Sequence, residues 1–451
     1  MRLPTPRPPR RALLAALVLG IASAGASAQS LQDLYLAAHG YDSGTLAARA
    51  SLDAAQLRYD QARGLRLPVV GLQLAGTRQL NATPDSPITQ TANTSSLGAT
   101  LNGSQSLYNP ANDATIAQAQ KAVDVSHADL DAAEQDLILR VSQAYFDVLG
   151  AQDTLTTANS SLKAIAEQVA SAKRNFEVGT ATITDTREAQ ARYDLARATL
   201  IQAENDLQTK RILLDQTVGR VGVIPRPLAV PVKVPPLVPS VLDEWVARGD
   251  AEHPQIRRAR LALEIARLDT EKARAGNLPT ASVGASYGRA KTNNRLSMAG
   301  FDGAYSTPST NSSIGVTVNV PLFAGFQVQN RIKETLVLED KSQDDVETAR
   351  RAVSQATRQL FYSFGSGAAQ VAALEAAESS SQLALDATQL GYKVGVRVNI
   401  DVLNAQAQLY STQAQLAIAR YGVVMTGLRL RQASGRLTAD DVADVNQLLQ
   451  R

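Results

Sequence analysis

The chain has 451 residues, of which 44% are hydrophobic but only 4% aromatic, with a net charge of +3 and no cysteine. The absence of cysteine excludes disulfides, thiolate metal sites and a cysteine nucleophile. Three histidines, His39, His127 and His253, lack the spacing of metal ligands. No metal or other cofactor is therefore expected.

The first 28 residues have the pattern of a secretory signal peptide. A basic start precedes the apolar run ALLAALVLGIASAG, which is too short to span a bilayer, and Ala26–Ala28 supply small residues for cleavage. We expect the mature chain to begin near Gln29; the alternative is a short buried helix. The leader carries four arginines and no acid, so the mature net charge is 3 − 4 = −1. The basic pI therefore gives no reason to expect nucleic acid as a partner.

Residues 29–221 are expected to form a first structural repeat of helix, two strands, long helix and helix. Residues 111–176 contain no proline and one glycine, and a helix of 66 residues spans about 100 Å. Shorter helices are expected at about 30–64 and 184–219. Apolar residues in the long helix recur near heptad spacing, which indicates coiled-coil packing. They include Leu130, Leu137, Val141, Val148 and Leu155.

Four segments alternate apolar and polar residues instead of following a helical period. Strands of about ten residues with one apolar face are typical of a transmembrane β-barrel, although half-buried hairpins of a soluble sheet alternate in the same way. The polar stretches 79–95 and 289–312 are expected to be aqueous loops between paired strands. The apolar faces comprise Val70, Leu72 and Leu74; Leu97, Ala99 and Leu101; Val283, Ala285 and Tyr287; and Ile314, Val316, Val318, Val320 and Leu322.

Residues 222–240 contain six prolines, so this linker cannot be helical and is expected to run extended around the helices. Residues 241–436 repeat the order of the first half, with a long helix at 327–392 and flanking helices at about 241–275 and 399–435. FEVGTATITDTREAQARY and YKVGVRVNIDVLNAQAQL align at a shift of 216 residues, which indicates an internal duplication. Residues 437–451 are expected to be a short polar tail.

Four strands cannot close a barrel, and open sheet edges are not tolerated in lipid. Three protomers would supply twelve strands, an even number within the bacterial range, and would leave an aqueous lumen. The predicted fold class is therefore mixed and mainly α. It combines a long α-helical coiled-coil barrel with a transmembrane β-barrel that takes four strands from each protomer.

The sequence resembles the TolC family of outer-membrane channel proteins over essentially the whole mature chain. The resemblance is carried by residues 175–207 and 391–421, by the Leu-Pro pairs at 67–68 and 278–279, and by the duplicated order. It implies a homotrimer with a β-barrel in the outer-membrane lipid and a helical tunnel in the periplasm. It also implies docking to a periplasmic adaptor protein and an inner-membrane transporter, with export of small toxic molecules, proteins or both.

The resemblance further implies which residues close the channel at the helix turns. Asp185, Tyr392 and Arg397 resemble the links that hold the inner helices shut, and the hypothesis is that Arg397 or Tyr392 bonds Asp185 in the closed state. Asp401 resembles a ring of acids that lines the periplasmic constriction. Asn404 departs from the family pattern, in which a second acid stands at this position of the constriction.

The same turns have an ordinary interpretation from helix chemistry. Gly179 and Gly395 are the expected C-terminal caps of the two long helices. Asp185 and Asp401 lie in the first turn of the helices that follow, where an acid complements the helix dipole. Capping and gating can hold together, since one side chain can serve both.

An enzyme is not expected, because the sequence contains no Ser-His-Asp order, phosphate-binding loop or metal-ligand set. The alternative function is a trimeric structural or surface coiled-coil protein of the outer membrane without an open conduit. That alternative accounts for the long helices but not for four amphipathic strands split between two halves. Cargo and inner-membrane partners are not encoded in any motif of the chain.

Overall fold

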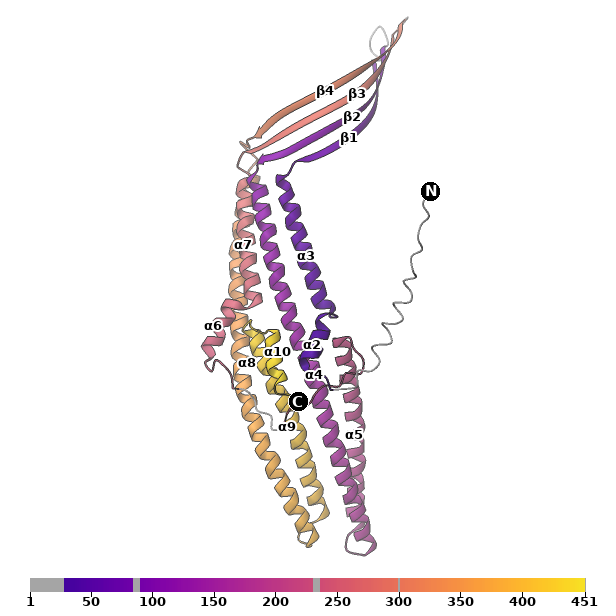
Figure 1. The fold of residues 1–451 in the computed structure, drawn as a ribbon, viewed down its shortest axis with the longest axis vertical. Helices are drawn as coiled ribbons and strands as arrows, with labels where there is room; N and C mark the ends of the chain where they lie inside the picture. The colour runs from indigo at the N-terminus through magenta and orange to yellow at the C-terminus, as the bar shows by residue number, and fades with distance from the viewer. Residues whose placement is uncertain (1–27, 84–89, 230–235, 299–300, 451) are drawn as a thin grey trace, which may run out of the picture. The chain divides into compact units, whose positions relative to one another are not determined.

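The computed structural model describes residues 28–83, 90–229, 236–298 and 301–450 (Figure 1). Long helices dominate this part of the chain, together with one four-stranded sheet, so the predicted mainly α class with four strands per protomer is confirmed. None of the described helices has the length and apolar character required to cross a bilayer. The predicted signal peptide lies outside the described residues, apart from Ala28. In chain order the elements are α2 (Leu31–His39), α3 (Ser43–Arg63), η1 (Gly64–Arg66), β1 (Val69–Thr83), β2 (Gln90–Tyr108), α4 (Pro110–Glu177), α5 (Ile183–Val218), α6 (Leu242–Glu252), α7 (Pro254–Ala275), β3 (Thr280–Met298), β4 (Phe301–Asn319), α8 (Gln327–Lys393), α9 (Asn399–Ala433) and α10 (Ala439–Asn446).

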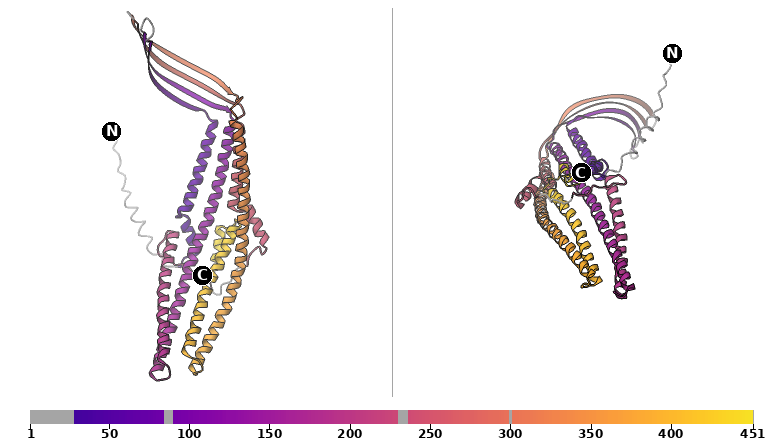
Figure 2. Two further views of the ribbon diagram at one scale, coloured as in Figure 1. Left: turned by 180° about the vertical axis from the view of Figure 1, so that it is seen from behind. Right: turned by 60° about the horizontal axis from the view of Figure 1, so that its bottom comes forward.

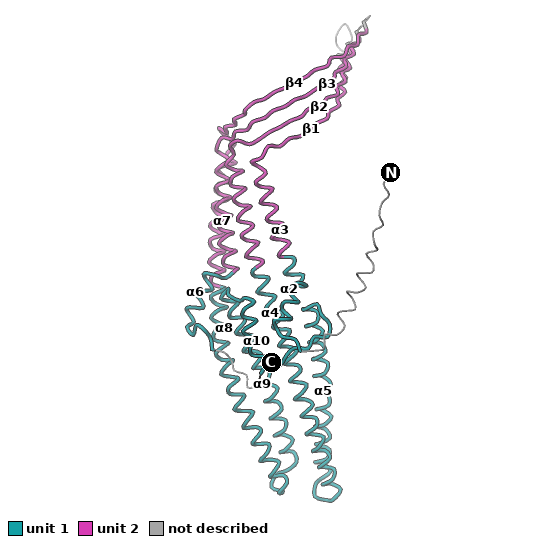
Figure 3. The backbone as a smooth tube through the Cα atoms, viewed as in Figure 1, with its two compact units in different colours: residues 1–47, 131–253, 352–451 teal, residues 48–130, 254–351 magenta. Residues whose placement is uncertain are grey.

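The chain divides into two compact units (Figure 3). The sheet unit comprises residues 48–130 and 254–351 and contains β1 to β4 with the helix segments that adjoin them. The hairpin unit comprises residues 1–47, 131–253 and 352–451 and contains the turns from α4 to α5 and from α8 to α9. The strands and the turns therefore belong to different units.

In the sheet unit the strands follow the order β1-β2-β3-β4, and every neighbouring pair is antiparallel. All four strands meet helices at the same end of the sheet, because β1 and β3 begin there and β2 and β4 end there. The helices at this end are α3, α4, α7 and α8. We call the opposite end of the sheet, where β1 and β3 end, the far end.

The two faces of the sheet differ in crowding. A Cβ atom added at Gly288 would lie 2.9 Å from Thr100 Oγ1, and one added at Gly98 would lie 3.3 Å from Ala290 Cβ. These close approaches fall on one face, which we call the inner face. They match the curvature of the sheet (Figure 2), because side chains converge on a concave face. The opposite, outer face carries the apolar residues that alternation predicts, including Val70, Leu72 and Ile314, each at least 67% exposed.

The strands are longer than predicted, and the predicted loops at 79–95 and 289–312 are therefore wrong over most of their length. β1 has 15 residues and β2, β3 and β4 have 19 each, with continuous pairing through the polar stretches. Backbone ladders join strands whatever the polarity of their side chains. Pro308, which indicates a loop in sequence, lies in β4, an outermost strand of the sheet, where proline is tolerated.

Two predicted flanking helices are also broken. The helix expected at about 30–64 is divided into α2 and α3 at Gly40–Asp42, where the Asp42 carboxylate accepts the Thr45 N–H at 2.8 Å and caps the second helix. The helix expected at about 241–275 is divided into α6 and α7 at His253, which precedes a proline and leaves the helical conformation.

The core of the hairpin unit joins α2, α4, α5, α9 and α10. Tyr145 is fully buried there, and its hydroxyl donates to the Arg226 carbonyl at 2.7 Å. Tyr421 donates to the Asp153 carboxylate at 2.6 Å and so joins α9 to α4. The predicted polar tail instead contains α10, whose Val442 is 1% exposed in this core. Its apolar residues Leu437, Val442, Val445 and Leu449 are all buried in this core.

Candidate functional site

The two turns that end α4 and α8 have the same backbone geometry. Gly179 has φ of 80° and donates its N–H to the Phe176 carbonyl at 3.0 Å, while Thr180 donates to Asn175 at 2.8 Å. This pair of bonds is a Schellman motif, which requires the left-handed conformation that glycine adopts without strain. Gly395 has φ of 82° and the same two bonds. The hairpins thus turn sharply at the two predicted glycines.

Asp185 caps the start of α5. Its carboxylate accepts the Thr182 hydroxyl at 2.8 Å and the Thr182 N–H at 2.9 Å, and its own N–H donates to the Thr182 hydroxyl at 3.2 Å. This arrangement is a capping box. Within the described residues, the Asp185 carboxylate makes neither of the bonds hypothesised for it, to Tyr392 or to Arg397, and bonds its own cap residue instead.

Arg397 lies across its own turn. Its Nη1 is 3.6 Å from the Asp401 carboxylate, one helical turn along α9, and both side chains are partly exposed. Its Cγ lies 2.8 Å from where a Cβ at Gly391 would stand, so the glycine makes room for the side chain. In this structure Arg397 and the predicted constriction residue Asp401 therefore form one local ion pair.

Tyr392 connects the two hairpins. Its hydroxyl accepts a hydrogen bond from Asn175 Nδ2 on α4 at 2.9 Å. Its ring packs against a buried cluster formed by α8 and α9, which includes Leu385 and Val402. The aromatic ring is therefore anchored in one hairpin while the hydroxyl reaches the other.

A buried amide on α9 makes a second connection. Asn399 is 4% exposed and accepts a hydrogen bond from Gln168 of α4. Its Nδ2 lies 3.5 Å from the backbone carbonyl oxygen of Asp185 on α5. Further along α9, the exposed Asn404 accepts from Arg192 of α5 at 3.2 Å. The polar contacts at Tyr392, Asn399 and Asn404 thus all run from α8 or α9 to the α4–α5 hairpin.

An apolar cluster backs these contacts. It contains the buried Ala172 of α4, Ala189 of α5 and Leu403 of α9, with Ile400 packed against it. Sequence analysis missed Asn175, Gln168 and Arg192, and it indicated Asn399 only as a possible N-cap, a position that Val398 occupies. Polar side chains at helix surfaces are common, and only the pairing of segments more than 200 residues apart gives these four their partners.

The described residues hold no group of three or more His, Cys, Asp or Glu side chains suited to a metal ion.

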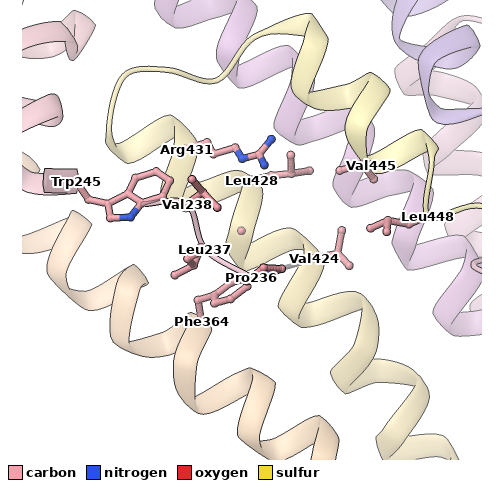
Figure 4. Close-up of a pocket in the computed structure, with 11 residues that line it drawn as sticks. Pro236, Leu237, Val238, Trp245, Phe364, Val424, Leu428, Arg431, Val445 and Leu448 are labelled. Carbon is pink, nitrogen blue, oxygen red and sulfur yellow. The ribbon is translucent and has the colours of Figure 1, made fainter. Parts of the chain in front are cut away.

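The hairpin unit contains an apolar pocket of about 340 Å³, shown in Figure 4, with Trp245, Phe364 and Leu428 in its wall. Leu237 and Val238 of the proline-rich segment also line it, and the Trp245 indole donates to the Pro239 carbonyl at 2.8 Å. The Arg431 guanidinium at the pocket pairs with acids of α10. The pocket therefore anchors this segment on α8 and α9 and offers no reactive group.

The sheet is curved, has an apolar outer face and continues at one end into long paired helices. This combination defines the class of outer-membrane channel proteins. The sequence profile of the outer membrane efflux protein family matches residues 45–220 and 247–436, and the chain belongs to this family. It is an outer-membrane efflux and secretion channel with a helical part in the periplasm. The family is a family of channels and not a known class of enzyme.

Individual relatives agree with this assignment. The outer membrane protein TolC of Vibrio cholerae is 30% identical over 440 residues, which cover 96% of this chain and 97% of the relative. The alkaline protease secretion protein AprF of Pseudomonas aeruginosa is 32% identical over 310 residues, covering 68% of this chain and 63% of the relative. The crystal structure of CusC matches the fold with a TM-score of 0.76 and 17% identity, covering 90% of this chain and 92% of that one.

Proposed function

We propose that three copies of this chain form one export conduit through the outer membrane, which docks to a periplasmic adaptor and an inner-membrane transporter. The observation that carries the proposal is the single sheet of the described residues, whose outermost strands β1 and β4 each have one unpaired edge. Unpaired edges are costly in lipid, and pairing β4 of one copy with β1 of the next closes a ring. A twelve-stranded ring is wide enough for an aqueous lumen.

We infer that the conduit opens and closes at the turns of the two hairpins. The contacts from Tyr392 and Asn399 to the α4–α5 hairpin support a closed arrangement in which each copy holds its hairpins together. In this proposal Asp185 acts by shaping the α5 start and Arg397 by fixing Asp401. Three symmetric sets of bonds break together on opening. The free energy that one bond contributes to the closed state is therefore tripled in the whole channel.

The constriction is proposed to carry three copies of Asp401 without a second ring of acids. Asn404 is neutral and already accepts a hydrogen bond from Arg192. A ring of carboxylates favours cations in a pore. We propose that the open constriction, in which Asp401 is separated from Arg397, is cation-selective, and Asp401→Asn is expected to lower that selectivity.

We further infer that the two halves are an internal duplication, with repeats at 29–221 and 241–436 joined by residues 222–240. Two features support this inference: the family profile matches one segment in each half, and α4 and α8 have 68 and 67 residues.

Cargo is proposed to include proteins, small toxic molecules or both. The secretion protein AprF and the efflux protein BepC of Brucella suis are both relatives, the latter 30% identical over 327 residues. Deleting the gene and comparing drug sensitivity with the set of secreted proteins separates the two. A deletion that changes neither would contradict a role in export.

Conductance of the purified trimer in planar lipid bilayers tests the conduit itself. A trimer that inserts and carries current in discrete steps supports the proposal. A folded, inserted trimer without current would instead favour a structural coiled-coil protein of the outer membrane.

A further inference from the structure

The charged residues of the sheet are confined to one face. The four strands contain five charged side chains, and strand register places all of them on the outer face. The inner face carries no charge among the described strand residues. Four of the five are cations, so the outer face has a net charge of 4 − 1 = +3. They are Arg78 on β1, Arg289, Lys291 and Arg295 on β3, and the single acid Asp302 on β4.

These four cations form a band on the outer face, which on β3 directly follows the apolar positions. Tyr287 lies opposite Leu101 of β2, which in turn lies opposite Leu72 of β1, and this is the last row in which β1, β2 and β3 all carry an apolar or aromatic residue. The next positions of β3 on the same face are Arg289, Lys291 and, two positions further, Arg295. On β3 the cations therefore lie between the exposed Tyr287 and the far end of the sheet, while exposed leucines of the other strands lie beside them, Leu97 opposite Lys291 and Leu74 in the row of Arg289.

The band is poorly compensated within the protein. Arg295 Nε lies 3.8 Å from Asp302, with both side chains at least 60% exposed. Arg78 Nε reaches only the neutral Asn93 amide, at 3.4 Å. Within the described residues, neither Arg289 nor Lys291 has an ion-pair partner. An exposed surface with excess positive charge beside an apolar band is suited to a ligand that is both anionic and amphipathic.

A polar hollow lies within the band. It measures about 410 Å³, and its lining includes Asn93, Ser95, Asn293, Arg295 and Ser306 of the outer face. Amide and hydroxyl groups of this kind bind sugar hydroxyls and phosphate oxygens, and an arginine can bind phosphate through two parallel bonds. The hollow thus supplies neutral hydrogen-bonding groups beside the cations.

We propose that this band, Arg78, Arg289, Lys291 and Arg295, binds the phosphate groups of the outer-leaflet glycolipid that surrounds the channel. The outer-membrane location puts the end of the sheet that joins the helices on the periplasmic side and the far end on the cell exterior. The band, with Leu74 and Leu97 beside it, then lies where head groups meet acyl chains in the outer leaflet, and the rows nearer the helices contact acyl chains. The inference rests on the proposed barrel, but it is independent of the hairpin contacts and of the cargo.

The test uses the full-length trimer in neutral detergent and two lipids with the same acyl chains. One is lipid A with both phosphates, and the other is the same lipid A with its phosphates removed. Native mass spectrometry counts the lipids retained. Wild-type protein is expected to retain the phosphorylated lipid about tenfold better, and added salt should remove the preference. Equal retention of both lipids by wild-type protein would overturn the proposal without any variant.

The variant Arg289→Gln/Lys291→Gln/Arg295→Gln is expected to lose the preference for phosphorylated lipid. The matched control Lys163→Gln/Lys173→Gln/Arg197→Gln removes three exposed cations from α4 and α5 and should keep it. Bilayer conductance measured on the same samples separates the two proposals. A conducting triple variant with undiminished phosphate preference refutes the lipid site alone, whereas wild-type trimers without current refute the conduit.

Discussion

Asn175 of α4 donates a hydrogen bond to the hydroxyl of Tyr392 of α8, with 2.9 Å between the nitrogen and the oxygen. The two residues are 217 positions apart in the chain, yet each stands just before the glycine that ends its long helix. This bond joins the two hairpins at their turns. It is the most direct physical candidate for a contact that must break when the turns separate.

Tyr392→Phe removes the hydroxyl and leaves the packed ring in place. One neutral bond contributes about 0.5–1.5 kcal/mol, so three equal bonds change the closed-to-open ratio by about 10- to 2000-fold. We expect a higher open probability in single-channel recordings. Tyr362→Phe, an exposed tyrosine of the same helix, should leave the open probability unchanged. Asn175→Ala should reproduce the effect of Tyr392→Phe, and the double variant should add little to either, because both remove the same bond.

Arg397→Ser separates gating from stability. The Arg397–Asp401 pair is exposed and spans 3.6 Å, so its loss should change the free energy of unfolding by about 0.5 kcal/mol or less. We expect thermal unfolding of the trimer to be nearly unchanged while conductance rises, because Asp401 loses the partner that fixes it at the turn. Unaltered conductance would leave Arg397 without a role in the gate.

Gly395→Ala should destabilise the turn after α8. The residue has φ of 82°, and a left-handed conformation costs an L-residue about 1–2 kcal/mol. Gly365→Ala in the middle of α8 is the matched control. This exposed helical glycine has open space around a new Cβ, and the substitution should stabilise by about 0.5–1 kcal/mol. Denaturant unfolding of both variants measures the contrast, and a stabilising Gly395→Ala would contradict the capping geometry.

Two buried tyrosines predict a loss of stability at alkaline pH. Burial raises the pKa of the Tyr145 hydroxyl, and burial together with the Asp153 carboxylate raises the pKa of Tyr421. In the unfolded chain tyrosine titrates near about pH 10. Above that pH the unfolded state releases protons that the folded state keeps, so the free energy of unfolding falls as pH rises.

The variant Tyr145→Phe/Tyr421→Phe should therefore show a shallower fall in stability between about pH 10 and 11. It should also be less stable than wild type at neutral pH, since the Arg226 carbonyl and the Asp153 carboxylate each lose a donor. Tyr362→Phe is again the exposed control. Equal slopes for the double variant and wild type in pH-dependent denaturant unfolding would contradict the assignment.

Backbone chemistry made much of the fold predictable from sequence. Proline-free stretches gave the long helices, and alternation gave the strand faces because its period is that of the pleat. Strand ends were mispredicted because polar residues continue a backbone ladder as readily as apolar ones, as Ser306, Thr307 and Ser309 do in β4. The outer-face cations at Arg289, Lys291 and Arg295 follow the same alternation. Their common face was therefore readable, although their row partners on other strands were not.

The candidate site was less predictable than the fold. Gly179 and Gly395 could be identified because a sharp helix end favours glycine. The contacts of Asp185 could not be predicted. A carboxylate near the start of a helix can accept hydrogen bonds from its own cap residue or from a distant donor, and the sequence does not distinguish the two. Asn399 lies in the first turn of a helix, and nothing local indicates that its amide is buried against Gln168. Such contacts depend on how two hairpins pack, which single-sequence patterns do not specify.

Single-channel current through the purified wild-type protein in a planar bilayer tests the central claim most directly. The account predicts that heat-resistant trimers insert and produce discrete current steps through a cation-selective pore. Trimers that are folded and inserted, but carry no current under any applied voltage, would contradict a conduit formed by the joined sheets and closed at the helix turns.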